Sequence, residues 1–170
     1  MIILFTAASV ACGSSEPTVD GDCANVTKGN TVPTRPGDLF TYLRCEGYAG
    51  LTAELAVHPS VSAHNSGRNV RTYINDALAD SLRAQNAEHP VGAAAVKVFL
   101  EPDDTTPNGF AVMVKTEAMG RGGEGWYWYE VFSATSGARP IEGQGNPTCT
   151  GCHAQAMRDL VRTEASAFGL

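Results

Sequence analysis

The 170-residue sequence lacks three features that mark common functional classes. Its 12 Lys and Arg are outnumbered by 18 Asp and Glu, which gives a formal net charge of -6, and the basic residues form no cluster. Because binding of a phosphate backbone needs a basic face, nucleic acid is excluded as a partner. The sequence also has no internal repeat, and no apolar run reaches the roughly 18 residues that a membrane span requires. The length indicates a single domain with one core.

The chain begins with a short apolar segment, residues 1–11, that stops at Cys12 and gives way to polar residues. Its length fits the hydrophobic region of a secretory signal. The small residues before Cys12 resemble a bacterial lipoprotein cleavage box, after which Cys12 would carry the lipid. Ser9 stands where Leu is usual and no Lys or Arg precedes the run. We expect a lipid-anchored protein at the periplasmic face of the envelope; a secreted protein without lipid and a cytosolic protein are the alternatives.

Two thiols and a histidine stand together near the C-terminus, in the sequence C-T-G-C-H at residues 149–153. Covalent attachment of haem c requires this spacing, because each Cys adds to one vinyl group and the adjacent His becomes the proximal ligand of the iron. We therefore expect Cys149 and Cys152 to hold one haem and His153 to bind its iron. A Cys149–Cys152 disulfide and half of a zinc site are the alternatives.

The sequence offers other candidate metal ligands, but their spacing or surroundings give less support for metal binding. His58, His64 and His89 form no second pair with zinc-ligand spacing, and we expect them at the surface or in hydrogen bonds. Met113 or Met119 as a sixth iron ligand would make the protein an electron carrier. Met113 lies in an apolar stretch where filling space is the commoner role.

The remaining cysteines agree with export. With Cys149 and Cys152 assigned to haem and Cys12 to lipid, Cys23 and Cys45 are left as a pair. A Cys23–Cys45 disulfide would be stable in an oxidising envelope and would tie the N-terminal segment to the body of the protein. Two unrelated buried thiols are the alternative.

Residue patterns predict the elements of the fold. Residues 12–36 are rich in Gly, Ser, Thr, Asn, Asp and Pro and predict a tether with an irregular lead-in. Helices are expected at 38–45 and 77–87, and strands at 70–74, 93–101, 110–116 and 126–132, with a short return at 139–142. A last helix should carry the haem motif and extend to about residue 163. These elements predict an α+β fold, mostly antiparallel sheet, with the haem domain at residues 37–170.

Several ordered motifs resemble the cytochrome P-460 family, which includes the cytochromes c′-β. They are V-R-T-Y-I-N at 70–75, G-A-A-A-V-K at 92–97, A-V-M-V-K at 111–115, W-Y-W at 126–128, C-T-G-C-H and D-L-V-R-T at 159–163. The resemblance covers about residues 38–165. It implies an antiparallel β fold, commonly a homodimer, with one haem c and an open distal iron site. One branch oxidises hydroxylamine and joins a lysine to the porphyrin; the c′-β branch binds nitric oxide or carbon monoxide without that link.

Matched by position, Lys97 corresponds to the cross-linking lysine, Arg71 to an arginine of the distal pocket and His153 to the proximal ligand. Asp159 corresponds to an aspartate that we interpret as structural. Lys97 and Arg71 are therefore the candidate catalytic residues. Ala111 stands where the hydroxylamine-oxidising branch has a distal glutamate. Oxidation of hydroxylamine removes protons as well as electrons, so a carboxylate beside the bound substrate would act as a general base. Ala111 cannot act in this way.

Lys97 interrupts an apolar strand, on one face with Ala95 and Phe99. It is either a strand-edge charge that reaches water or a buried amine with a lowered pKa, as a nucleophile requires. We expect a distal pocket lined by Arg71, Phe99, Phe110, Ala111 and Met113. The sequence thus predicts an envelope haem protein for small nitrogen species, with a redox partner protein. Oxidation of hydroxylamine, gas binding without turnover, and electron transfer stay open.

Overall fold

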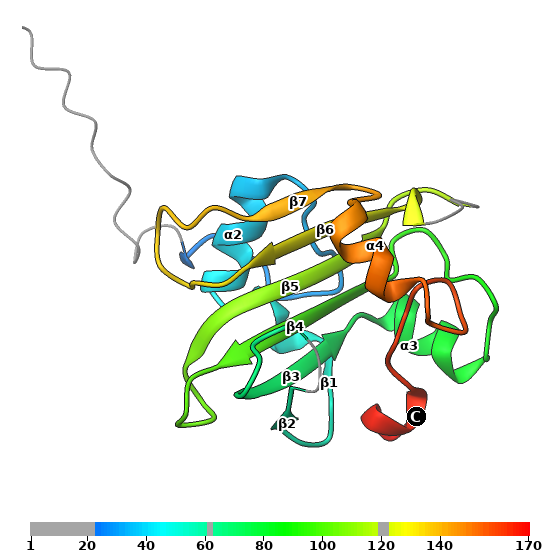
Figure 1. Ribbon diagram of the computed structural model, residues 1–170, viewed down its shortest axis with the longest axis horizontal. Coiled ribbons are helices and arrows are strands. Elements are labelled where there is room, and N and C mark those ends of the chain that lie inside the picture. The colour runs from blue at the N-terminus through cyan, green and yellow to red at the C-terminus, as the bar shows by residue number, and fades with distance from the viewer. Residues whose placement is uncertain (1–22, 61–62, 119–122) are drawn as a thin grey trace, which may run out of the picture.

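A computed structural model describes residues 23–60, 63–118 and 123–170 (Figure 1). Its centre is a seven-stranded antiparallel sheet in the order β1-β3-β4-β5-β6-β7, and β2 also pairs with β3. The strands are β1 Thr52–Ala53, β2 His58–Pro59, β3 Asn69–Ile74, β4 Ala94–Leu100, β5 Pro107–Lys115, β6 Trp126–Val131 and β7 Ile141–Gln144. From β3 to β7 each strand pairs with the next one along the chain, which confirms the predicted α+β fold with mostly antiparallel sheet.

Helices cover both faces of this sheet. They are α2 Pro36–Arg44, α3 Asp76–Arg83 and α4 Pro147–His153, with the short 3-10 turns η1 Gly47–Gly50 and η3 Ala165–Phe168. Helix α3 is capped by Asn75, whose side chain accepts a hydrogen bond from the Leu78 backbone N–H at 3.1 Å, so one otherwise unpaired N–H of the first turn is satisfied.

Strand alternation divides the core into two clusters. The α2-side cluster joins Leu39 and Leu43 of α2 to the sheet residues Val96, Val98, Phe110, Val112, Tyr129 and Val131. The α3-side cluster joins Leu78 and Leu82 of α3 to Ala95, Met113, Trp126, Trp128 and Phe168. Every residue of β4 is buried except Lys97, which is half-buried. Position 97 therefore lies where the α3-side cover is incomplete.

The last helix is shorter than the sequence indicates. We expected it to reach about residue 163, but α4 ends at His153. Asp159 and Leu160 have φ values of 41° and 68°, a left-handed conformation that no α-helix contains. Their turn is closed by a bridge between Arg158 and Val161. The prediction was wrong because contacts distant in sequence, described below, draw Asp159 away from a helical path.

The N-terminal lead-in is attached to the body of the protein. Cys23 and Cys45 form a disulfide with a Cα–Cα distance of 5.2 Å, the pairing expected from the cysteine count. Val32 is buried in the α2-side cluster. The expected signal at residues 1–11 and the lipid site at Cys12 lie outside the described residues. In the part of the chain that the structure describes, no helix has the length and apolar character to cross a membrane.

Candidate haem site

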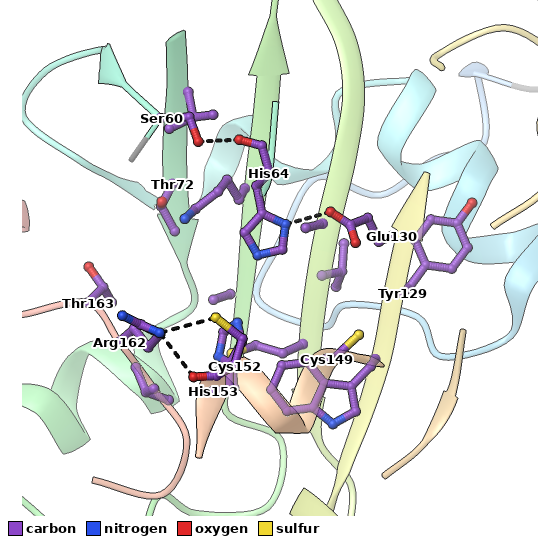
Figure 2. A pocket seen from close by; sticks show the side chains of 18 of the residues that line it. Ser60, His64, Thr72, Tyr129, Glu130, Cys149, Cys152, His153, Arg162 and Thr163 are labelled. Atoms are coloured by element: carbon purple, nitrogen blue, oxygen red, sulfur yellow. Dashed lines mark hydrogen bonds and ion pairs between the residues drawn. The ribbon is translucent and has the colours of Figure 1, made fainter. Parts of the chain in front are cut away.

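A cavity of about 310 Å³ lies on the α3 side of the sheet, between the strands, the loop after β2 and helix α4 (Figure 2). One residue from each of four neighbouring strands forms a row across its wall: Thr72, Lys97, Ala111 and Glu130 are successive cross-strand partners. Cys149, Cys152 and His153 of α4 line the opposite side. Residues predicted from the haem motif and from the sheet therefore meet in one cavity.

The two thiols are presented by the first turns of α4. The Asn146 side chain accepts a hydrogen bond from the Thr148 backbone N–H at 3.0 Å, and Pro147 occupies the first turn, where its missing N–H costs nothing. Cys149 and Cys152, three residues apart, are both free and both line the cavity. Burial, with a smaller effect of Glu130, raises the pKa of Cys149 to about 11.

Neither alternative for these thiols is favoured by the structure. Cys149 and Cys152 are not joined by a disulfide. A structural zinc site needs four ligands such as thiolates and imidazoles, so these two thiols would supply half of one. Among residues 23–60, 63–118 and 123–170, no group of three or more His, Cys, Asp or Glu side chains is arranged to hold a metal ion.

His153 is held in the form that binds iron. Its Nδ1 lies 2.7 Å from the carbonyl oxygen of Leu160. Because a carbonyl only accepts, Nδ1 carries the proton and donates, which leaves the lone pair on Nε2. Burial lowers the pKa of His153 to about 4, so the ring is neutral at physiological pH. The Trp128 ring packs edge-on against it, with ring centroids 4.7 Å apart.

The Leu160 carbonyl is itself positioned by a buried ion pair. Lys115, whose side chain is fully buried, donates to Asp159 at 2.8 and 3.1 Å. Asp159 also accepts from the Trp126 indole N–H at 3.1 Å and from the His89 backbone N–H at 3.0 Å. Four hydrogen bonds thus fix Asp159, the residue next to Leu160. The structural role inferred for Asp159 agrees with this arrangement.

Lys97 is a half-buried amine on a central strand and not a strand-edge charge. Burial lowers its pKa, and the nearby Glu54 and Glu130 carboxylates partly oppose that effect. Both carboxylates line the same cavity. Glu54 accepts from the Thr72 backbone N–H at 2.6 Å and lies 3.2 Å from Nε2 of His58. The polar part of the cavity therefore contains one amine and two carboxylates.

Glu130 and His64 form a pair on the cavity wall that sequence reasoning missed. Nδ1 of His64 lies 2.5 Å from Oε1 of Glu130, and Figure 2 shows the two side chains directed toward each other. Glu130 stands beside Ala111 on the neighbouring strand. In the sequence, the single carboxylate in the apolar segment W-Y-W-Y-E-V-F could have indicated a functional residue at this position. His64 had been expected at the surface or in a hydrogen bond; it makes the hydrogen bond, but inside the cavity.

Two residues expected in the distal pocket lie on the other face of the sheet. Arg71 pairs across the ladder with Val98 of the α2-side cluster, and its guanidinium donates to the Glu54 carbonyl oxygen at 2.8 and 3.0 Å. Phe110 belongs to the same cluster. Because side chains alternate along a strand, the neighbouring Thr72 and Ala111 face the cavity instead. The placement of Arg71 and Phe110 in the pocket was therefore wrong.

The other expected pocket residues lie on the cavity side. Ala111 and Met113 line the cavity directly. Phe99 lies behind His64, with ring centroids 5.9 Å apart, and supports the wall without forming it. Met119 lies outside the described residues.

This donor set fits a c-type haem: two thiols one helical turn apart, an adjacent neutral imidazole with a fixed ring, and a cavity that all three line. A family model for cytochrome P-460 matches residues 51–163. The chain belongs to the cytochrome P-460 family. All the residues that line the cavity, from Glu54 to Thr163, lie within the matched range.

Membership of the cytochrome P-460 family implies a haem cofactor for this chain. A search of curated proteins finds no match. The family therefore gives the class of cofactor, and the residues of the cavity are the basis for inferring the chemistry.

Proposed function

We propose that this P-460 family member is an exported c-type haem protein that binds small nitrogen species and oxidises hydroxylamine. Cys149 and Cys152 would hold the haem, with His153 as ligand to its iron. The observation that carries the proposal is the carboxylate of Glu130 on the cavity wall beside Ala111. The Cys23–Cys45 disulfide supports export, because such bonds persist in oxidising compartments.

Glu130 supplies the proton acceptor that position 111 lacks. When bound, the haem would supply an iron centre for the nitrogen compound and a route for its electrons to an external acceptor, a redox partner protein. Each oxidation step also releases protons, and a carboxylate within reach of the substrate can accept them. The Glu130 side chain is almost completely buried in the cavity wall.

Steady-state oxidation of hydroxylamine by haem-loaded protein, with excess electron acceptor, tests the proposal. We expect turnover well above that of free haem, and a loss of about 10²-fold or more in Glu130→Gln, the usual contribution of a positioned base. Glu101→Gln is the matched control, because Glu101 is an exposed carboxylate that pairs with Arg68 away from the cavity. A wild-type rate no better than free haem, or an undiminished rate in Glu130→Gln, would contradict the function.

Gas binding without turnover is the second candidate, and the apolar part of the cavity favours it. The lining includes five apolar or mainly apolar side chains, those of Val70, Ala95, Ala111, Met113 and Trp128. Such a surface suits nitric oxide or carbon monoxide, which need no proton transfer. Tight binding of either gas with no oxidation of hydroxylamine would identify this function.

A covalent bond between Lys97 and the porphyrin would distinguish these two functions. Its amine faces the cavity, and burial lowers its pKa, which favours the neutral form that a nucleophile requires. A haem peptide that also carries the Lys97 segment would support hydroxylamine oxidation. A haem peptide without it would favour gas binding.

A further inference from the structure

Two histidines from distant parts of the chain face each other across the cavity. His64 comes from the loop after β2 and His153 from the end of α4, and both line the cavity. Their ring centroids are 6.2 Å apart, with an interplanar angle of 66°. Figure 2 shows the His64 ring directed toward the part of the cavity where Cys152 and His153 lie.

Each ring is oriented through its Nδ1. His153 donates from Nδ1 to the Leu160 carbonyl at 2.7 Å, and Nδ1 of His64 lies 2.5 Å from a carboxylate oxygen of Glu130. A histidine that binds a metal almost always has its second ring nitrogen bonded to a carbonyl or carboxylate, which fixes the tautomer and makes the ring a stronger ligand. Both histidines show this arrangement, so coordination by either would come from Nε2.

The spacing of the rings fits one iron between them. An iron bound by two imidazoles needs about 2 Å to each nitrogen and roughly a further 1 Å from each nitrogen to its ring centre, or about 6 Å in total. The observed centroid separation is 6.2 Å. A distal histidine that only donated to a bound ligand would lie farther away, because atoms of the ligand would occupy the gap.

His64 is also supported from behind. Its ring packs against Phe99, with centroids 5.9 Å apart, and Phe99 packs against Phe132 at the same distance. The Ser60 hydroxyl donates to the His64 carbonyl oxygen, which ties the loop backbone to the segment after β2. Side chain and backbone are thus both held at the cavity.

We propose that His64 is the second axial ligand of the iron in the resting protein, opposite His153. This inference rests on the haem attachment proposed above. It makes the resting site six-coordinate, so a small nitrogen compound binds only when His64 leaves. Glu130 positions His64 in the resting state.

The experiment compares the spin state and ligand binding of haem-loaded wild type and His64 variants. We expect low-spin, six-coordinate absorption and electron paramagnetic resonance spectra for wild type. His64→Gln, which retains a polar side chain near Glu130, and His64→Ala should both become high-spin. Binding of carbon monoxide to the ferrous variants should be tighter by about tenfold or more, because the apparent affinity of wild type is reduced by its small open fraction.

His58→Ala is the matched control, because His58 also lines the cavity but pairs with Glu54. It should keep the low-spin spectrum. A high-spin wild type that binds carbon monoxide as tightly as His64→Ala would overturn the proposal, and so would a low-spin spectrum that persists without His64. Acidified organic extraction distinguishes absence of the His64 ligand from absence of covalently bound haem. Release of the haem on extraction would show that the covalent attachment in the proposed function is absent.

Discussion

His89 is a buried histidine whose role is separate from the cavity. It is 2% exposed, its Nδ1 lies 2.8 Å from the Ser81 hydroxyl, and its ring packs edge-on against Trp126. Its Nε2 has no hydrogen-bond partner among the described residues. Burial lowers the pKa of His89, with Asp159 opposing the shift and Lys115 and Arg158 adding to it. Burial therefore favours the neutral form of this ring in the folded protein.

We predict that His89 makes the protein less stable as pH falls from 7 toward 5. Its folded-state pKa lies below the ordinary value of about 6.5, so the unfolded chain takes up the proton first. The contribution of the neutral ring to the free energy of unfolding is complete above the unfolded-state pKa. It is lost as the pH falls through the lower folded-state pKa. Thermal unfolding at several pH values should show a smaller decrease in Tm over this range for His89→Gln than for wild type. Equal decreases would show that His89 does not titrate in this way.

Single residues also show what the sequence could predict. The haem motif was identified directly because its residues are contiguous, and Lys97 was identified because a charge interrupts an apolar strand. Glu130 was missed because its place beside Ala111 depends on the register between β5 and β6. Arg71 was misplaced because the face of a strand changes with every residue, so Thr72 occupies the pocket instead.

Among the elements, the turn after α4 connects the sheet to His153. The buried Lys115–Asp159 pair joins β5 to this turn, and the turn presents the Leu160 carbonyl to His153. The sequence predicted a helix here because the residues after the haem motif have no strong helix breaker. The left-handed Asp159 and Leu160 depend on contacts with residues more than 30 positions away. Local propensity could not reveal them.

We predict that breaking this ion pair destabilises the fold. Asp159→Ala or Lys115→Met should lower the free energy of unfolding by about 3–5 kcal/mol, because each leaves a buried charge without its closest partner. The double variant should lose less than the sum of the two. Chemical denaturation of the haem-free protein measures this. The exposed Arg68–Glu101 pair is the control, and Glu101→Gln should cost less than about 1 kcal/mol. Single variants as stable as wild type would contradict the assigned role.

In the molecule as a whole, the two faces of the sheet have different roles. The α2 side is an apolar core closed by helix α2 and attached to the lead-in by the Cys23–Cys45 disulfide. On the α3 side the cover is incomplete, and the gap is the cavity that contains the thiols, both carboxylates and both facing histidines. The sheet thus gives one rigid wall to a site whose other wall is α4 and the turn that follows it.

We infer that this cavity holds a haem bound through Cys149 and Cys152. Mass spectrometry of the proteolytic peptides, from protein matured in an export-competent host, tests it most directly. Cys149→Ser/Cys152→Ser protein from the same host is the control and should carry no covalent haem. We predict that the wild-type peptide with residues 149–153 carries the mass of one haem. Recovery of that peptide with two unmodified thiols, from a host that attaches haem to a reference cytochrome, would contradict the account.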